Sequence, residues 1–349
     1  MPFTIDDPSV YFQTLIYSGN STDDRDLTNT GNSNLQPDWL WIKERTDTSS
    51  HQLINTTLGI RYANFTDKND ALDDDQNRVQ AVSSDGFQVG TASTVNANGD
   101  DYVAFQWKAN GGTTSTNSDG TIDTTIQASA ISGFSIIKWT GTGSNGTIGH
   151  GLGKKPGFFA LKRTGAAEGW SCYVDGLDAG AGKILSFAST SAASSSSGDF
   201  NDTEPTSSVI SVGTQDRTNS NGQEHIGYVF TPIQGFSAMG QYDGNGNSDG
   251  TFVHTGFKVG WLLIKSLEGT TDWRMFDNKR DSTNVVKGRL FPNTTDTENT
   301  SQDTLDFLSN GFKIRTTNSG SNGNNNAYFY LAFAETPFVT STGVPTTAV

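Results

Sequence analysis

The stretch Trp39-Leu-Trp-Ile-Lys43 decides the fold, because closely similar stretches return twice further along the chain. Phe158-Phe-Ala-Leu-Lys162 begins 119 residues later, and Trp261-Leu-Leu-Ile-Lys265 begins a further 103 residues on. Each stretch carries apolar residues on both faces of an extended chain, which is typical of an interior β-strand that ends at a lysine. A period of about 100 residues has the size of a domain and exceeds the roughly 20–50 residues of a solenoid unit. The sequence therefore predicts three related domains.

Other motifs recur with similar offsets. An aromatic residue followed by a polar, Gly-rich turn opens each repeat, at Tyr17, Trp139 and Tyr242. The block Trp170-Ser-Cys-Tyr-Val174 returns as Trp273-Arg-Met-Phe-Asp277 and has a weaker echo that begins at His51.

Near the end of each repeat, an Asn-rich turn separates two further apolar runs. Asn96-Ala-Asn-Gly99 and Asn219-Ser-Asn-Gly222 are the clearest copies, and 318–326 is the third. Asn-Gly between alternating apolar runs predicts a type I′ hairpin turn.

The repeats set the domain boundaries that we predict. They are 1–108 for repeat one, 109–132 for a linker, 133–231 for repeat two, 232–338 for repeat three and 339–349 for a C-terminal tail. The linker contains one alternating stretch, 121–126, which predicts either an edge strand or a strand that crosses to a neighbouring subunit. Repeats two and three are joined by only 231–234, so we expect them to be rigidly attached and repeat one to be freer.

The composition indicates an all-β protein. Among 349 residues there are 39 glycines, and only 33% of residues are hydrophobic, so each core must be thin. Thin cores with many turns are typical of β-sandwiches. We therefore expect three tandem β-sandwich repeat domains of jelly-roll or lectin-like type, with Trp39 and Trp41 in the core.

Charge and hydropathy exclude several classes of partner. The formal net charge of −14 argues against a nucleic-acid partner and against an anionic membrane surface. No apolar run approaches the roughly 18 residues of a membrane span, and the residues after Met1 lack the features of a secretory signal, so we expect synthesis in a cytoplasm without export or membrane insertion. The single cysteine, Cys172, lies in an apolar strand pattern and is expected to be a buried, inert thiol.

No catalytic constellation is visible in the sequence. The seven glutamates are isolated from one another, and the four histidines lack the spacing of a zinc site. His150 and His254 occupy related places, for which a turn role is expected, and the Gly-rich stretch 149–155 lacks the full phosphate-loop pattern. We therefore expect no enzyme activity and no cofactor, with a carbohydrate-active enzyme as a remote alternative.

One loop suggests a weak calcium site. Asp243, Asn245, Asn247 and Asp249 place oxygen donors at every second position, but Ser248 and His254 stand where an EF-hand needs Gly and Glu. A plain Gly-Asn turn is the competing interpretation. A second acidic run consists of Asp70 and 73–75. It could bind a divalent ion, but a solvated run of charges is the commoner explanation.

The motifs together resemble a known domain. The segments 242–246, 261–265, 272–277, 306–315 and 330–338, with their counterparts in repeat two, are similar to a repeat domain of uncharacterised structural, tail-fibre-like proteins of marine tailed bacteriophages. The resemblance covers roughly 8–338. It implies a virion protein assembled in the host cytoplasm and brings no catalytic residues with it.

These observations lead to a functional expectation. We expect a tail-fibre or receptor-binding component that displays long polar loops (64–77, 189–205 and 293–302) to a host surface glycan or protein. The alternative is a capsid decoration or head-fibre protein. Expected partners are other virion proteins and further copies of the chain, most simply in a homotrimer with Ile122, Ile126, Phe338 and Val339 at the interface and with acidic loops pointing outward.

Overall fold

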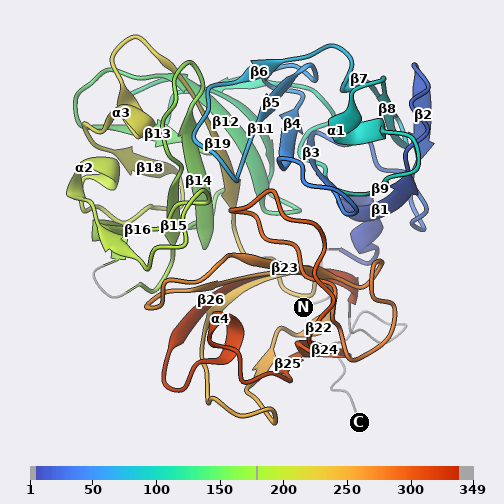
Figure 1. The fold of residues 1–349 in the computed structure, drawn as a ribbon. Helices are drawn as coiled ribbons and strands as arrows, with labels where there is room; N and C mark the ends of the chain where they lie inside the picture. Colours follow the sequence, from blue (N-terminus) through green and yellow to red (C-terminus); the bar gives the residue numbers. More distant parts are fainter. Residues whose placement is uncertain (1–4, 178–179, 338–349) are drawn as a thin grey trace.

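The computed structural model describes residues 5–177 and 180–337, and it confirms the all-β class. The named strands pair antiparallel throughout, and each of the four α-helices has only four residues. In Figure 1 the three repeated parts of the sequence form three lobes, with repeat one in blue, repeat two in green and repeat three in orange.

Each repeat contributes one large sheet. The sheet of repeat one has the strand order β1 (Phe12–Ser18), β9 (Asp101–Trp107), β3 (Trp39–Glu44), β4 (Gln52–Asn55), β5 (Tyr62–Asn64) and β6 (Asp73–Asp74). That of repeat two has the order β10 (Ser115–Asn117), β11 (Thr124–Ser129), β12 (Phe134–Thr140), β19 (Glu224–Phe230), β14 (Phe158–Arg163) and β15 (Ser171–Val174). That of repeat three has the order β20 (Ser237–Asp243), β26 (Ala327–Pro337), β22 (Phe257–Ser266) and β23 (Arg274–Asp277).

Smaller sheets and short helices complete each lobe. The small sheets are β2 (Arg25–Thr28), β8 (Gly86–Val89) and β7 (Val79–Ser83); β13 (Gly146–Gly149) and β18 (Val209–Val212); β21 (Phe252–His254), β25 (Gly311–Ile314) and β24 (Leu305–Leu308); and β16 (Lys183–Ile184) with β17 (Ser194–Ser195). The helices are η1 (Pro8–Val10), α1 (Ser93–Asn96), η2 (Gly180–Gly182), α2 (Ser197–Phe200), α3 (Asp216–Asn219) and α4 (Ser319–Asn322).

The predicted equivalence of Trp39, Phe158 and Trp261 is confirmed by strand register. Each lies on the strand next to the last strand of its repeat, where Trp39 pairs with Trp107, Phe158 with Phe230 and Trp261 with Phe333. The aromatic residue that opens each repeat is also equivalent, because Tyr17 stacks on Tyr102, Trp139 on His225 and Tyr242 on Tyr328 with centroids 5.1–5.2 Å apart.

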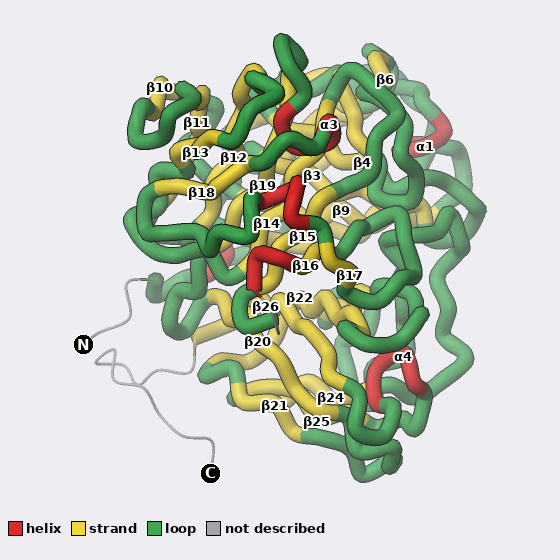
Figure 2. The backbone as a smooth tube through the Cα atoms, turned by 90° about the vertical axis from the view of Figure 1, so that its left-hand side faces the viewer, coloured by secondary structure: helices red, strands yellow, loops and turns green. Residues whose placement is uncertain are grey.

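The inner faces of the three large sheets meet in one core. Alternate residues of each interior strand point to opposite sides, so Trp39 and Trp41 join the shared cluster while Leu40 and Ile42 join a separate cluster beneath the small sheet of repeat one. The shared cluster draws on all three repeats. Figure 2 shows β3, β9, β14, β19, β22 and β26 gathered in the middle of the molecule.

Repeat one is firmly attached, and the expectation that it would be freer is wrong. Trp39 stacks on Tyr228 of repeat two at 4.4 Å between centroids, and Phe12 stacks on Phe333 of repeat three at 5.2 Å. The linker that separates repeats one and two in the sequence therefore does not separate them in space, because burial of the aromatic side chains brings the sheets together.

The linker supplies edge strands, as one of the two interpretations predicted. β11 pairs with β12, and β10 extends the same sheet. Ile122 and Ile126 are buried in the core of repeat two, each with 8% of its surface exposed, so they do not provide an oligomer interface. Phe338 and Val339 lie outside the described residues.

The Asn-rich turns do not form hairpins, and that prediction is wrong. β8 and β9 flank the first turn but belong to different sheets, and the short helix α1 precedes the turn. The reason is the buried Asn96 side chain, whose Nδ2 donates to Gly90 O at 2.8 Å and Thr22 O at 2.9 Å. Asn219 and Asn322 close α3 and α4 with equivalent bonds.

Candidate functional site

The chemistry of this molecule is concentrated where one repeat meets the next. Each long polar loop is bonded through its backbone to the residue that directly follows an interior strand of a neighbouring repeat. Leu72 N donates to Thr164 O at 2.8 Å, Ala193 N to Leu267 O at 2.9 Å, and Glu298 N to Arg45 O at 2.9 Å. Each of the three acceptors stands two residues after the lysine that ends the repeated stretch. Part of each loop is therefore structural, and only the remainder is free to contact a partner.

The lysine at the end of each interior strand is buried at such a junction. Lys43, Lys162 and Lys265 are each fully shielded from solvent. Their Nζ atoms donate to carbonyl oxygens of the neighbouring repeat's loop, at Thr295 (3.3 Å), Asn69 (3.1 Å) and Thr190 (3.0 Å) in that order. Each Nζ also donates to a carbonyl of its own repeat. The pattern is cyclic. The lysine of repeat one bonds the loop of repeat three, the lysine of repeat two bonds the loop of repeat one, and the lysine of repeat three bonds the loop of repeat two.

Burial sets the ionisation of these lysines. Loss of hydration lowers the pKa of each of the three amines to about 8, and nearby carboxylates only partly oppose that effect. The neighbouring Glu44 titrates close to neutrality as well, since burial and the Asp100 carboxylate raise its pKa to about 7.

A second cyclic set of bonds lies beside the lysines. Trp170 Nε1 donates to Phe65 O at 2.7 Å and Trp273 Nε1 to Ser186 O at 3.0 Å. His51 takes the third place, with its Nε2 lying 3.0 Å from Phe291 O. Because His51 Nδ1 accepts from Trp41 Nε1, the proton is on Nε2, and burial keeps the ring neutral by lowering its pKa well below the usual value.

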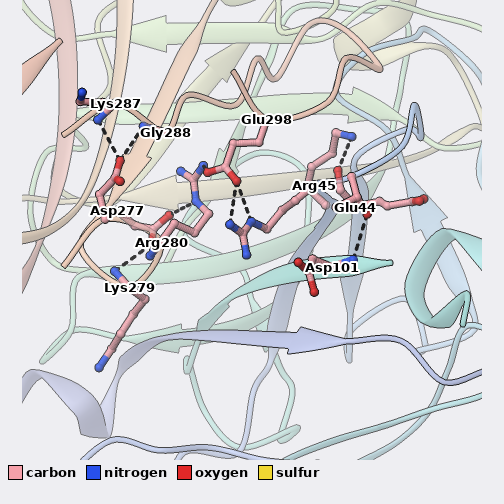
Figure 3. Close-up of polar contacts among 12 residues, drawn as sticks. Glu44, Arg45, Asp101, Asp277, Lys279, Arg280, Lys287, Gly288 and Glu298 are labelled. Atoms are coloured by element: carbon pink, nitrogen blue, oxygen red, sulfur yellow. Dashed lines mark hydrogen bonds and ion pairs between the residues drawn. The ribbon is translucent and has the colours of Figure 1, made fainter. Parts of the chain in front are cut away.

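The junction between repeats three and one carries a chain of ion pairs, shown in Figure 3. Arg280 contacts Asp277 and lies 2.6 Å from Glu298, and Glu298 in turn lies 2.7 Å from Arg45 of repeat one. Asp277 also accepts the backbone N–H groups of Lys279 and Arg280. Burial alone would lower the pKa of Arg280, but the two carboxylates reverse this and raise it.

This ion-pair chain is absent from the other two junctions between described repeats. Thr164 and Leu267 stand where repeat one has Arg45, so the other two junctions keep the backbone bond but lack this charged partner. Repeats one and two, and repeats two and three, are consecutive in the chain, whereas repeats three and one are not. The added charges therefore lie at the one junction whose two repeats are not consecutive in the chain.

The calcium candidates form a turn closed by its own side chains. Asn245 Oδ1 accepts from Asn247 N and Asn247 Oδ1 from Asp249 N, both at 3.0 Å. Asp249 lies 2.7 Å from Lys313, which holds the pKa of its carboxyl below the usual value, and Asp243 is exposed. A cation would have to displace Lys313, so calcium binding stays a hypothesis that a titration of the protein with Ca²⁺ would test.

The other predicted residues are placed as follows. Cys172 is buried, as predicted, and burial raises the pKa of its thiol. His150 is buried and accepts from Leu152 N, which agrees with a turn role, whereas His254 is exposed. In the described ranges, no group of three or more His, Cys, Asp and Glu side chains could hold a metal ion.

Sequence reasoning missed the junction residues. Lys43, Lys162 and Lys265 were visible as a repeated motif, but their role required knowing that the loops cross between repeats. Arg280 and Glu298 left no signal, because they have no counterparts in the other repeats. No helix in the described part of the chain is long and apolar enough to cross a membrane.

The described residues form an all-β fold in which contacts at the junctions hold the three repeated segments together. Residues 7–337 match the family described as "Domain of unknown function (DUF7483)", and the chain belongs to that family. No curated protein and no solved structure matches the chain.

Proposed function

We propose that this chain is a structural protein of a bacteriophage particle, with no enzymatic role, and that it serves as a tail-fibre or receptor-binding component. The observation that carries the proposal is the cyclic set of junctions. Three repeats share one aromatic core, and each long polar loop is held against a neighbouring repeat by a backbone bond and by a buried lysine. Such an arrangement suits a rigid body that presents loops to a host surface, and the resemblance to virion proteins supports the same assignment.

We infer that each repeat is a β-sandwich of the jelly-roll or lectin-like kind, in which the small sheet covers the outer face of the large one. The separate hydrophobic clusters beneath the small sheets support this interpretation. We also propose that the chain forms a homotrimer on the particle. Because Ile122 and Ile126 are buried, other residues must form the contacts between the copies. The candidates are the large exposed hydrophobic residues of the described chain, namely Ile16, Ile131 and Phe252.

The decisive experiment is localisation on purified particles. Antibodies raised against the chain and visualised by immunogold labelling should mark the tail, and the purified protein should reduce adsorption of the phage to its host. Labelling of the head would instead favour the decoration or head-fibre alternative, and absence from particles would contradict both.

Assembly has its own test. Multi-angle light scattering of the purified protein should give three times 37.4 kDa. A mass of one chain at micromolar concentration would contradict the trimer and leave the localisation result unaffected.

A further inference from the structure

The first strand of repeat one forms an open edge of its sheet. β1 pairs with β9 on one side, and in the described ranges it pairs with no strand on the other. Its seven residues pair with β9 without a bulge, and they include no proline and no charged side chain. Bulges, prolines and charges are the usual devices that protect an exposed edge from pairing with another chain. β1 therefore keeps the ability to accept a further strand.

The chain itself covers the equivalent edge of repeat two. β12 is the counterpart of β1, because each pairs with the last strand of its repeat, which in turn pairs with the interior strand. β11 lies on the other side of β12 and continues the sheet. The fold of a repeat therefore accommodates an added strand at this edge.

The corresponding edge of repeat three is held against repeat two. Met239 of β20 lies so close to Gly157 that a Cβ on the glycine would be 2.8 Å from the methionine sulfur. Gln241 of the same strand donates from its Nε2 to Asp175 O at 3.2 Å. Strand register places Ile16 where repeat three has Gln241, and Ile16 is 44% exposed. β1 is therefore the most open of the three counterparts at this position.

Backbone groups of β1 point toward the open edge at every second residue. The pairs just before and just after the strand, Tyr11 with Lys108 and Gly19 with Asp100, are bonded to each other at 2.9 and 2.7 Å. Bonded and non-bonded pairs alternate along an antiparallel ladder. The even-numbered residues of β1 therefore direct their N–H and C=O groups away from β9.

A groove runs along this edge. A cavity of about 280 Å³ is bordered by Phe12 and Thr14 on one face of β1 and by Gln13 on the other, so it follows the edge rather than either face. The loop 30–32 flanks it on one side, and Gly260 of repeat three flanks it on the other. Because both flanks belong to the folded chain, the groove admits one extended segment and excludes the edge of a folded sheet.

The charges around the groove balance. Asp7, Glu335 and Lys279 are the charged residues of its lining. Asp7 Oδ2 accepts from Ser33 Oγ at 2.7 Å, and Glu335 lies 2.6 Å from Lys258. Two acidic and two basic groups therefore offset one another, which favours an uncharged segment. β11, which lies at the equivalent edge of repeat two, also carries no charged residue.

One side chain of β11 shows how the neighbouring repeat takes part. Gln127 Nε2 donates to Thr56 Oγ1 and Thr57 Oγ1 of repeat one, both at 2.8 Å. Asn278 and Lys279 stand in the corresponding places of repeat three, because Asn278 N donates at 3.0 Å to the residue just before the interior strand, as Thr56 N does. A segment bound at β1 thus presents a polar side chain to the Asn278 amide, which both donates and accepts.

We propose that the open edge of β1 binds one extended, uncharged segment of another protein of the particle, which adds to the sheet as β11 does in repeat two. The inference rests on the proposed function for the source of the segment, whereas the capacity of the edge to bind a strand does not. Ile16 then belongs to this contact, and Ile131 and Phe252 stay as candidates for contacts between copies of the chain.

The first test uses the purified full chain and, as the probe, a fluorescently labelled synthetic peptide with the sequence of 124–130, titrated by fluorescence anisotropy. We expect a Kd on the order of 100 µM, because a short strand gains main-chain bonds but loses conformational freedom when it binds.

Two methylated peptides test the geometry while the protein stays unchanged. Thr125 and Gln127 of β11 lie opposite the counterparts of Ile16 and Thr14, so their N–H groups face the edge. N-methylation of the peptide at these two positions should weaken binding at least tenfold. N-methylation at the two alternate positions, 126 and 128, should leave the affinity within about threefold, because those N–H groups face away.

A pair of protein variants tests the location. Ile16→Pro removes an N–H that faces the open edge and keeps the bonds to β9, and it should weaken binding of the peptide at least tenfold. Gln241→Pro makes the same change at the corresponding position of β20 and should leave binding unchanged. Thermal unfolding of both variants checks that they remain folded.

The source of the segment is tested on purified particles. A thiol-linked photocrosslinker attached at Ile16→Cys labels that position selectively, because Cys172 is buried. We expect a crosslink to another protein of the particle, identified by mass spectrometry. A crosslink to a second copy of the chain, or no crosslink, would overturn the proposed partner.

The binding edge has its own contrary outcomes. No binding of the unmodified peptide at about 1 mM, or equal affinity of the two methylated peptides, would overturn β1 as a binding edge. Absence of the chain from particles would instead contradict the proposed function and leave the peptide result standing, so the two failures are distinguishable.

Discussion

At the scale of single residues, charged groups buried at the repeat junctions link stability to pH. Lys43, Lys162 and Lys265 lie within carbonyl-lined sites that exclude water. Nearby carboxylates favour the ammonium form, but burial disfavours it more and lowers each pKa to about 8. The folded protein therefore releases these protons at a lower pH than the unfolded chain.

We predict that stability increases between pH 8 and 9.5 through these lysines. In that window the unfolded chain binds more protons than the folded one, so the free energy of unfolding rises with pH, by at most about 1.4 kcal/mol per pH unit for each lysine. Urea denaturation of the unmodified chain and of Lys162→Met at both pH values measures the effect. Both proteins contain Cys172 and the buried tyrosines, whose titration works in the opposite direction, so the difference between them isolates Lys162. Equal pH dependence in the two proteins would show that Lys162 keeps an ordinary pKa.

The ion-pair chain gives a second prediction. Glu298→Ala removes the carboxylate that joins Arg280 to Arg45, and it should lower the free energy of unfolding by about 3–5 kcal/mol, the range for breaking a buried pair. The matched control is Asp303→Asn, which breaks the exposed pair with Lys287 at 3.0 Å and should cost less than about 1 kcal/mol. Equal losses in denaturant titrations would mean that the junction does not depend on these charges.

At the scale of elements, the sequence predicted the interior strands because both their faces are apolar and because they are repeated. It also predicted the added strand of the linker. It failed at 96–99, 219–222 and 318–326, where local turn preferences indicated a hairpin and tertiary structure overrode them. In each case the first buried asparagine of the turn bonds one carbonyl six residues earlier and one carbonyl more than 70 residues earlier, and that requirement separates the flanking strands into different sheets.

We predict that the buried asparagine is essential to this element. Asn322 Nδ2 donates to Thr316 O and Asn247 O, both at 2.7 Å, and its Oδ1 accepts from Asn245 N at 2.9 Å. Asn322→Ala leaves those buried groups without partners and should cost about 1–3 kcal/mol in thermal or urea unfolding. Asn324→Ala, at an exposed position of the same turn, should change stability by less than about 0.5 kcal/mol.

At the scale of the whole molecule, the repeats meet around one core. The period of the sequence indicated three domains but could not show that their inner faces meet, since an apolar face has the same pattern whether it covers its own repeat or a neighbouring one. That meeting depends on contacts between residues more than 100 positions apart, such as Phe12 with Phe333.

The shared core predicts cooperative unfolding. Trp261→Ala removes a side chain that contacts Phe12, Trp41 and Trp107 of repeat one as well as its own repeat, and it should cost about 3–5 kcal/mol. Calorimetry should show one transition for the unmodified chain and one transition at lower temperature for the variant. Two transitions, with only one of them shifted, would mean that the repeats unfold separately.

The closure of repeat three onto repeat one has a consequence for how such a protein can change over generations. A ring assembled from three identical chains can alter a junction only in triplicate, because one gene encodes all three copies. In a ring formed by three repeats of a single chain, one junction can change while the other two stay as they are. His51 can replace a tryptophan and Arg45 can introduce a charge, each at one junction while the other two keep the molecule closed.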